Sequence, residues 1–264
     1  MKIGFIGAGN MGGAIIGGIV KNKICDPSEI IAADMNEKLL SNIKERYGIN
    51  VTRSNEEAAA AQMLFLCVKP GVVYTVIDEI AEYVKPGTIV VSIAAGQPIE
   101  KLMAAFGNDD LKLARVMPNT PALVGEGMAA VSPNDNMSTE EAGKVLDIFN
   151  SLGKAEIVSE RLMDAVTAVS GSSPAYVFMF IEAMADAAVQ GGMPRAQAYT
   201  FAAQSVLGSA KMVLDTGKHP GELKDMVCSP SGTTIDAVEV LEQEGMRNAV
   251  IKAMKACIDK SRSM

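Results

Sequence analysis

The chain has 264 residues, of which 48% are hydrophobic and 21% charged, and its formal net charge is −7. This composition excludes a disordered chain, and the acidic balance argues against a nucleic acid or an anionic membrane as the main partner. Four cysteines without a C-x-x-C pair favour reduced thiols and a cytoplasmic location. The apolar run 3–6 is too short for a signal peptide, and the apolar stretch 175–189 contains Glu182 and Asp186 and falls short of the roughly 20 residues of a membrane span.

The first part of the chain alternates apolar, strand-like segments with helix-like segments. Strands are expected at 3–6, 29–33, 63–68, 88–93, 112–117 and 128–132. Helices are expected at 11–21, 37–47, 56–61 (with Asn55 as its cap), 72–83, 99–106 and 139–151. Apolar strands separated by helices predict a parallel sheet covered on both faces, as in a doubly wound α/β domain. We assign residues 1–158 to this Rossmann domain.

The pattern becomes helical near Ser159. Helices are expected at 176–190, 195–214, 233–243 and 245–262. The 176–190 helix is apolar nearly all round, which predicts burial. In a domain of about 100 residues, that burial is expected to be against a second copy of the chain. Residues 159–264 are therefore predicted to form an all-helical domain that dimerises.

A glycine motif at the start of the chain indicates a dinucleotide site. Residues 7–12 (Gly-Ala-Gly-Asn-Met-Gly) match G-x-G-x-x-G, directly after one strand and at the start of a helix. In this motif the first glycine permits a tight turn, the second lets the backbone approach a pyrophosphate, and the third packs the helix on the strand. Asp34 lies at the end of the second expected strand. In dinucleotide-binding domains, an acidic residue at this position binds the adenosine ribose and favours NAD over NADP. The alternative is that Asp34 is an ordinary helix cap. We expect NADH or NADPH as the cofactor.

Three further loops follow strand ends, where doubly wound sheets bind ligands. Residues 68–71 (Val-Lys-Pro-Gly) and 94–96 (Ala-Ala-Gly) should flank the nicotinamide half of the cofactor, or they are plain turns. Lys69 is the charged residue among them. Asn119, in the segment 117–121, could orient a ligand or cap a turn.

The helical half contains one unusual small-residue loop. Residues 229–234 (Ser-Pro-Ser-Gly-Thr-Thr) open a helix, whose amides favour an anion such as a carboxylate; a plain capped start is the alternative. The serines at 170–173 do not match G-x-S-x-G, and the single histidine, His219, has no partner cluster. This argues against a serine hydrolase and a zinc site, and no metal is expected. His219-Pro220-Gly221 is typical of a helix entry.

Taken together, these segments resemble the pyrroline-5-carboxylate reductase family. The resemblance covers essentially the whole chain and is carried by residues 5–12, 68–70, 92–96, 117–122, 170–176 and 219–234. It implies that NAD(P)H reduces the cyclic imine 1-pyrroline-5-carboxylate to L-proline, the last step of proline biosynthesis. It also implies homodimers with interlocked helical domains, often assembled further, and sites near the dimer interface.

The resemblance also implies roles for individual residues. Cofactor contacts are expected from Ile6, Gly7, Ala8, Gly9, Asn10, Met11, Asp34, Asn55, Val68, Lys69, Pro70, Ala94, Ala95 and Gly96. Substrate contacts are expected from Asn119, Ser229, Gly232, Thr233 and Thr234, with Thr234 as the catalytic partner of the ring nitrogen.

Two residues depart from the family pattern. Ser231 stands where the family usually has glycine, so a positive φ there would cost energy. Asp34 stands where several relatives have a small hydroxyl residue, and its carboxylate is expected to repel a 2′-phosphate.

Two rival functions remain. The first is a related Rossmann reductase acting on another small imino or hydroxy acid, but β-hydroxyacid dehydrogenases need a lysine that the 176–190 helix lacks. The second is an NAD(P)-binding redox sensor without turnover.

Overall fold

The computed structural model describes residues 2–264. By internal contacts it divides into two units, residues up to 172 together with 257–264, and residues 173–256. This division differs from the boundary expected after residue 158, because the turns at 160–171 pack with the sheet domain and the last residues return to it. Within residues 2–264, no helix combines the length and apolar character that a membrane span needs.

Unit 1 is built on an eight-stranded sheet in the order β3-β2-β1-β4-β5-β6-β7-β8. The pairs are parallel except for β6 with β7, which is antiparallel. The strands are β1 (Ile3–Ile6), β2 (Ile30–Ala33), β3 (Asn50–Thr52), β4 (Met63–Leu66), β5 (Ile89–Ser92), β6 (Lys112–Met117), β7 (Gly127–Pro133) and β8 (Gly153–Ile157).

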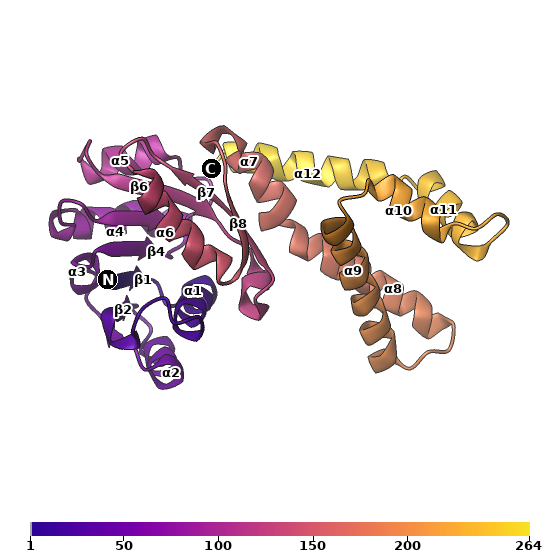
Figure 1. The fold of residues 1–264 in the computed structure, drawn as a ribbon, viewed down its shortest axis with the longest axis horizontal. Helices are drawn as coiled ribbons and strands as arrows, with labels where there is room; N and C mark the ends of the chain where they lie inside the picture. The colour runs from indigo at the N-terminus through magenta and orange to yellow at the C-terminus, as the bar shows by residue number, and fades with distance from the viewer. Residues whose placement is uncertain (1) are drawn as a thin grey trace. The chain divides into compact units, whose positions relative to one another are not determined.

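Helices cover both faces of this sheet (Figure 1). One face carries α1 (Asn10–Lys21), α2 (Glu37–Tyr47) and α6 (Thr139–Asn150), and the other carries α3 (Asn55–Ala59), α4 (Val73–Ile80) and α5 (Ile99–Phe106). Side chains alternate along each strand, so Phe5 and Phe65 stack on the first face at 4.7 Å between ring centroids. Leu64 and Leu66 enter the core on the second face. The predicted Rossmann architecture is confirmed.

Three details of the sheet domain differ from the sequence predictions. The sheet is mixed, because β6 and β7 are joined by the short 3₁₀ turn η4 (Thr120–Val124) and not by a crossover helix. The edge strands β3 and β8 were not predicted, since Asn-Val-Thr and Gly-Lys-Ala-Glu-Ile lack the apolar run of a buried strand. Asn55 is not the cap of α3. The Ser54 hydroxyl has that role and accepts from the Glu57 N–H at 3.2 Å.

Unit 2 consists of helices. They are α8 (Ser173–Gln190), α9 (Arg195–Thr216), α10 (Pro220–Val227), α11 (Thr233–Gln243) and the larger part of α12 (Met246–Arg262). His219 caps α10 through Nδ1, which accepts from the Gly221 N–H at 3.1 Å, and Pro220 takes the first helical position, as predicted.

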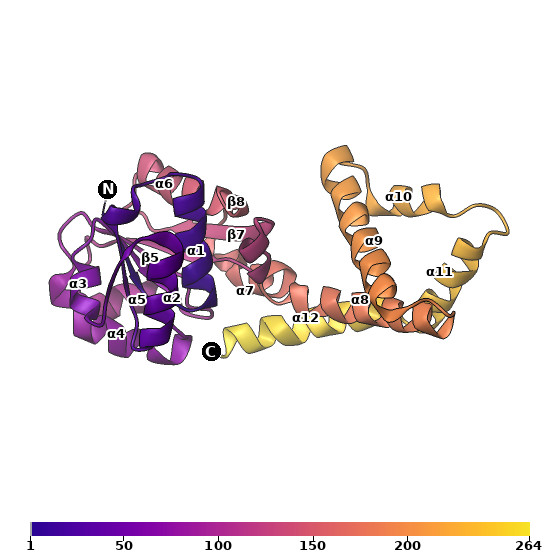
Figure 2. The same ribbon diagram turned by 90° about the horizontal axis from the view of Figure 1, so that it is seen from below.

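The helices of unit 2 enclose little core of their own, and Figure 2 shows them in an open arrangement. In the described chain the buried side chains of α8, α9 and α10 are Ala185, Ala198, Ala202 and Leu223. Phe178 and Met179 on α8 are 62% and 69% exposed. The burial predicted for the 176–190 helix is therefore not found within a single chain.

Candidate active site

The three glycines of the loop between β1 and α1 differ in what surrounds them. Gly7 has φ of 101°, and a Cβ there would lie 2.4 Å from the Cys67 carbonyl oxygen. A Cβ on Gly12 would lie 2.2 Å from the Gly7 carbonyl oxygen. Among the described residues, no atom lies within 4 Å of a Cβ built on Gly9. Two glycines are thus required by packing, whereas Gly9 borders open space, as expected for a loop that a pyrophosphate approaches.

The start of α1 is suited to an anion. Gly9 is the N-cap residue, and within residues 2–264 no side chain caps this end and its first turn holds no acidic residue. The first amides of a helix have no partner inside the helix, and the helix dipole is positive there. This end can therefore donate hydrogen bonds to a phosphate.

Asp34 lies beside this loop, at the carboxyl end of β2. Its Oδ2 accepts from the Ala8 N–H at 2.8 Å, and its Oδ1 accepts from the Asn36 N–H at 2.8 Å. The N-cap of α2 is Asn36, whose side chain accepts from the amides of Lys38 and Leu39. Asp34 is therefore not the helix cap that was the alternative to a ligand role.

The loops after β4 and β5 end at the same edge of the sheet, because β1, β4 and β5 are parallel. Lys69 is exposed and precedes the 3₁₀ turn η2 (Pro70–Val72). Gly96 has φ of 72°, and a Cβ there would lie 2.8 Å from the Cβ of Met264. The structure thus brings Val68, Lys69 and residues 94–96 to the edge that carries the glycine loop.

Asn55 lies farther out, at the first position of α3. Its Nδ2 donates to Glu79 Oε2 at 2.8 Å. The structure therefore gives its amide a protein partner, and a cofactor contact from Asn55 stays a prediction.

Two sequence motifs pack on each other at the end of β6. Asn119 is buried; its Nδ2 donates to the Ser170 carbonyl oxygen at 3.0 Å and its Oδ1 accepts from the Met128 N–H at 2.8 Å. Gly171 lies against Met117, whose Cε would be 2.3 Å from an added Cβ. Residues 167–171 form a π-helical turn, a geometry often found at functional sites. These two bonds hold the Asn119 amide in place, and a substrate contact from Asn119 stays a prediction.

The loop at residues 229–234 lies in unit 2. Gly232 is the N-cap of α11, its N–H donates to the Ser229 carbonyl oxygen at 3.1 Å, and a Cβ there would lie 2.3 Å from Ser229 Oγ. Ser231 has φ of 53°, the left-handed conformation that glycine adopts more easily. In the described chain no side chain caps α11, so its first amides and the hydroxyls of Thr233 and Thr234 are available to an anion.

Comparison with known proteins gives one family for the whole chain. A sequence profile described as pyrroline-5-carboxylate reductase dimerisation matches residues 160–264, and one described as NADP oxidoreductase coenzyme F420-dependent matches residues 2–96. A pyrroline-5-carboxylate reductase of Escherichia coli is 53% identical over 100% of this chain and 98% of its own length. The chain belongs to the pyrroline-5-carboxylate reductase family.

Solved structures of the family have the same fold. The pyrroline-5-carboxylate reductase of Coxiella burnetii is 32% identical, with a TM-score of 0.91 over 99% of this chain and 97% of its own. The enzyme of Plasmodium falciparum, which has NADP bound, is 34% identical with a TM-score of 0.91 over 100% of this chain and 97% of its own. The family predicted from the sequence is confirmed.

The residues of this pyrroline-5-carboxylate reductase family member fit a dinucleotide. The gap at Gly9 and the uncapped start of α1 match a pyrophosphate, and the carboxylate of Asp34 can accept from ribose hydroxyls. Behind the loop, burial raises the pKa of the Cys67 thiol, which disfavours its reactive thiolate form.

An ion pair between a buried arginine and a half-buried glutamate, which sequence analysis missed, supports the loop after β5. Arg115 on β6 is 8% exposed, and its Nη1 lies 3.0 Å from Glu160 Oε1. The same oxygen accepts from the Ile99 N–H at 2.7 Å, at the start of α5, where the cap residue Pro98 supplies no side-chain acceptor. In the sequence, a proline at the cap position indicates that the first amides of α5 need an acceptor from elsewhere. The sequence does not indicate which residue supplies it, because Glu160 lies 61 residues from Ile99.

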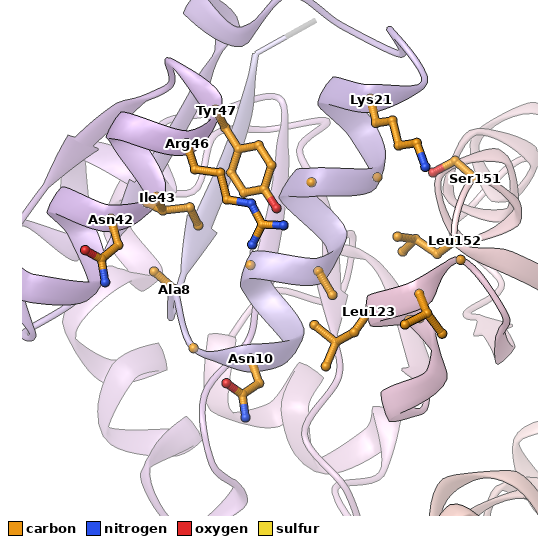
Figure 3. Close-up of a pocket in the computed structure, with 18 of the residues that line it drawn as sticks. Ala8, Asn10, Lys21, Asn42, Ile43, Arg46, Tyr47, Leu123, Ser151 and Leu152 are labelled. Atoms are coloured by element: carbon orange, nitrogen blue, oxygen red, sulfur yellow. The ribbon is translucent and has the colours of Figure 1, made fainter. Parts of the chain in front are cut away.

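A hollow of about 570 Å³ runs along the outer face of α1 (Figure 3). Asn10 lies at one end, and Lys21 and Ser151 lie at the other, about 16 Å along the helix. Gly17 lines the hollow beside Tyr47, whose hydroxyl would be 2.5 Å from an added Cβ. The end near Asn10 belongs to the cofactor edge, whereas the rest follows from the packing of α1 against α2.

Proposed function

We propose that this chain reduces 1-pyrroline-5-carboxylate to L-proline, the last step of proline biosynthesis, with NADH or NADPH as the reductant. The observation that carries the proposal is the 53% identity to a pyrroline-5-carboxylate reductase, because it extends over the full chain. The match therefore includes both the glycine loop and the loop at residues 229–234.

The chemistry needs little acid–base help from the protein. An imine nitrogen is far more basic than a ketone oxygen, so it is protonated by solvent before reduction. The bound cofactor supplies a hydride to the C=N carbon, and the π electrons move to nitrogen to give the secondary amine. The protein contributes orientation and a complementary charge environment.

The residues divide this work between the two units. Unit 1 holds the cofactor through the glycine loop, the start of α1 and Asp34. In unit 2, the amides at the start of α11 and the hydroxyls of Ser229 and Thr233 bind the substrate carboxylate. The hydroxyl oxygen of Thr234 accepts a hydrogen bond from the iminium N–H and fixes the orientation of the ring.

The experiment follows the oxidation of NADH and of NADPH by absorbance, with 1-pyrroline-5-carboxylate added. Turnover is expected with at least one cofactor, and no oxidation with either would overturn the proposal. Thr234→Ala should lower kcat/KM by about 10- to 100-fold, the scale of one lost hydrogen bond to a charged group. The matched control is Thr139→Ala, because Thr139 also begins a helix but that helix is capped by Ser138. Equal kinetics for both variants would remove Thr234 from the site.

We also propose that the chain forms a homodimer through unit 2 and works in the cytoplasm. The exposed apolar side chains of α8 support the dimer, because a face of this kind is stable in water when a second copy covers it. Phe178→Glu should therefore produce monomers in sedimentation. The free thiols of Cys25, Cys67, Cys228 and Cys257 suit a reducing compartment, which cell fractionation tests.

A further inference from the structure

The carboxylate of Asp34 has capacity for a ligand beyond the bonds it makes in the protein. Its two oxygens together offer about four acceptor sites. The amides of Ala8 and Asn36 occupy one site on each oxygen, both at 2.8 Å. These bonds fix the carboxylate next to the glycine loop, on an edge that is partly open to solvent. A diol that approaches the loop can therefore donate two hydrogen bonds to a positioned acceptor.

The charged groups around Asp34 do not favour a phosphate. The neighbouring residue is Met35, which is 72% exposed and carries no charge. Glu37 adds a second carboxylate at the start of α2. Arg53, the arginine that follows β3, is paired with this glutamate at 2.8 Å between Nη1 and Oε1. Its charge is therefore already balanced, and Lys38 is the other cation on this segment that a phosphate could recruit.

We propose that Asp34 makes this chain selective for NADH over NADPH. The proposal rests on the reductase function proposed above and names the cofactor of that site. In NADH, the 2′- and 3′-hydroxyls of the adenosine ribose donate to the Asp34 carboxylate. In NADPH, the 2′-phosphate loses a donor and places negative charge against a fixed carboxylate, which is unfavourable at close range. The chain then differs from the Plasmodium falciparum relative, which has NADP bound.

The test measures binding directly, with the full chain and no substrate. Dissociation constants for NADH and NADPH come from nucleotide fluorescence titrations of the wild type, Asp34→Ser and Asp34→Asn. The wild type should bind NADH at least about 10-fold more tightly, and both variants should reverse or abolish this ratio. The ratio of the two dissociation constants is the informative quantity, because a loosened glycine loop would weaken the binding of NADH and NADPH alike. Asp109→Ser, which removes an exposed aspartate from a turn, is the control and should keep the wild-type ratio.

The salt dependence of binding and the choice of nucleotide fragment distinguish electrostatic repulsion of the 2′-phosphate from a steric misfit. If repulsion disfavours NADPH, its disadvantage should shrink as ionic strength rises, because salt screens exposed charges. In the wild type, adenosine 5′-monophosphate should raise the melting temperature more than adenosine 2′,5′-diphosphate. Lys38→Met should weaken NADPH alone if this lysine recruits the phosphate.

The two proposals fail in different ways. A wild-type chain that oxidises both nucleotides with 1-pyrroline-5-carboxylate but binds NADPH more tightly overturns the Asp34 inference and leaves the reductase function intact. A chain that binds NADH but turns over neither nucleotide overturns the reductase function. A wild-type ratio that survives Asp34→Ser also overturns the inference. If Asp34→Ser does not fold, the Asp34→Asn variant and the dependence of nucleotide binding on ionic strength still test the role of Asp34.

Discussion

Gly9 and Gly12 offer a test that separates the fold of the glycine loop from its function. Gly9 has φ of −69°, which alanine adopts without strain, and no described atom lies within 4 Å of its added Cβ. We expect Gly9→Ala to change the free energy of unfolding by less than about 1 kcal/mol, because the lost preference for glycine at an N-cap and the lower entropy of the unfolded chain oppose each other. The new methyl group would still occupy the approach of a pyrophosphate. NADH binding should weaken at least about 10-fold, which corresponds to about 1.4 kcal/mol.

Gly12→Ala, in contrast, should mainly lower the free energy of unfolding. Its Cβ would lie 2.2 Å from the Gly7 carbonyl oxygen, about 1 Å inside normal contact, so the helix or the loop must move. Overpacking of this kind costs about 3 kcal/mol. Urea unfolding measures stability, and fluorescence titration measures the affinity for NADH. Wild-type NADH affinity in Gly9→Ala, or a loss of stability equal to that of Gly12→Ala, would contradict the assignment of the gap to the cofactor.

Three other perturbations test the energetics of the fold. Ser231→Gly should raise the free energy of unfolding by about 0.5 to 1 kcal/mol, because the residue has φ of 53°; a lower thermal midpoint would refute this. The pKa of Glu141 is lowered from 4.5 to about 2, chiefly by the hydrogen bond from Lys112, so its contribution to stability is complete above pH 4.5 and is lost as the pH falls toward 2. Acid titration of unfolding should show this loss, and Glu141→Gln should remove that part of the pH dependence. Arg115→Met should destabilise unit 1 by about 1 to 2 kcal/mol, because it removes a charged hydrogen bond to the half-buried Glu160 carboxylate, whereas the double variant with Glu160→Gln should recover part of that loss.

Local chemistry made a large part of the fold predictable. The helices 37–47, 99–106 and 233–243 were predicted with the bounds that the structure has. In the first two, Gly48 and Gly107 end the helix in the left-handed conformation, a signal carried by a single residue. The edge strands escaped prediction because an edge strand is stabilised by its pairing partner and not by an apolar sequence of its own.

In the candidate site, too, some features follow from local sequence and others from tertiary contacts. The tight turn at Gly7, whose φ is 101°, and the helix entry at Pro220 follow from local backbone geometry, which depends on a few neighbouring residues, so the sequence alone determined them. The family was also predictable, because its motifs are spread along the chain from residue 5 to residue 234.

Only the tertiary structure decided which groups these residues face. The carboxylate of Asp34 meets the amide of Ala8, Asn119 meets the Ser170 carbonyl, and Glu160 caps a helix that begins at Ile99. Each of these bonds joins segments that are distant in sequence, and no local pattern encodes a contact that depends on how the strands are ordered in the sheet. The apolar surface of α8 was predictable from its composition, and its exposure in the single chain agrees with the burial against a second copy that the sequence predicted.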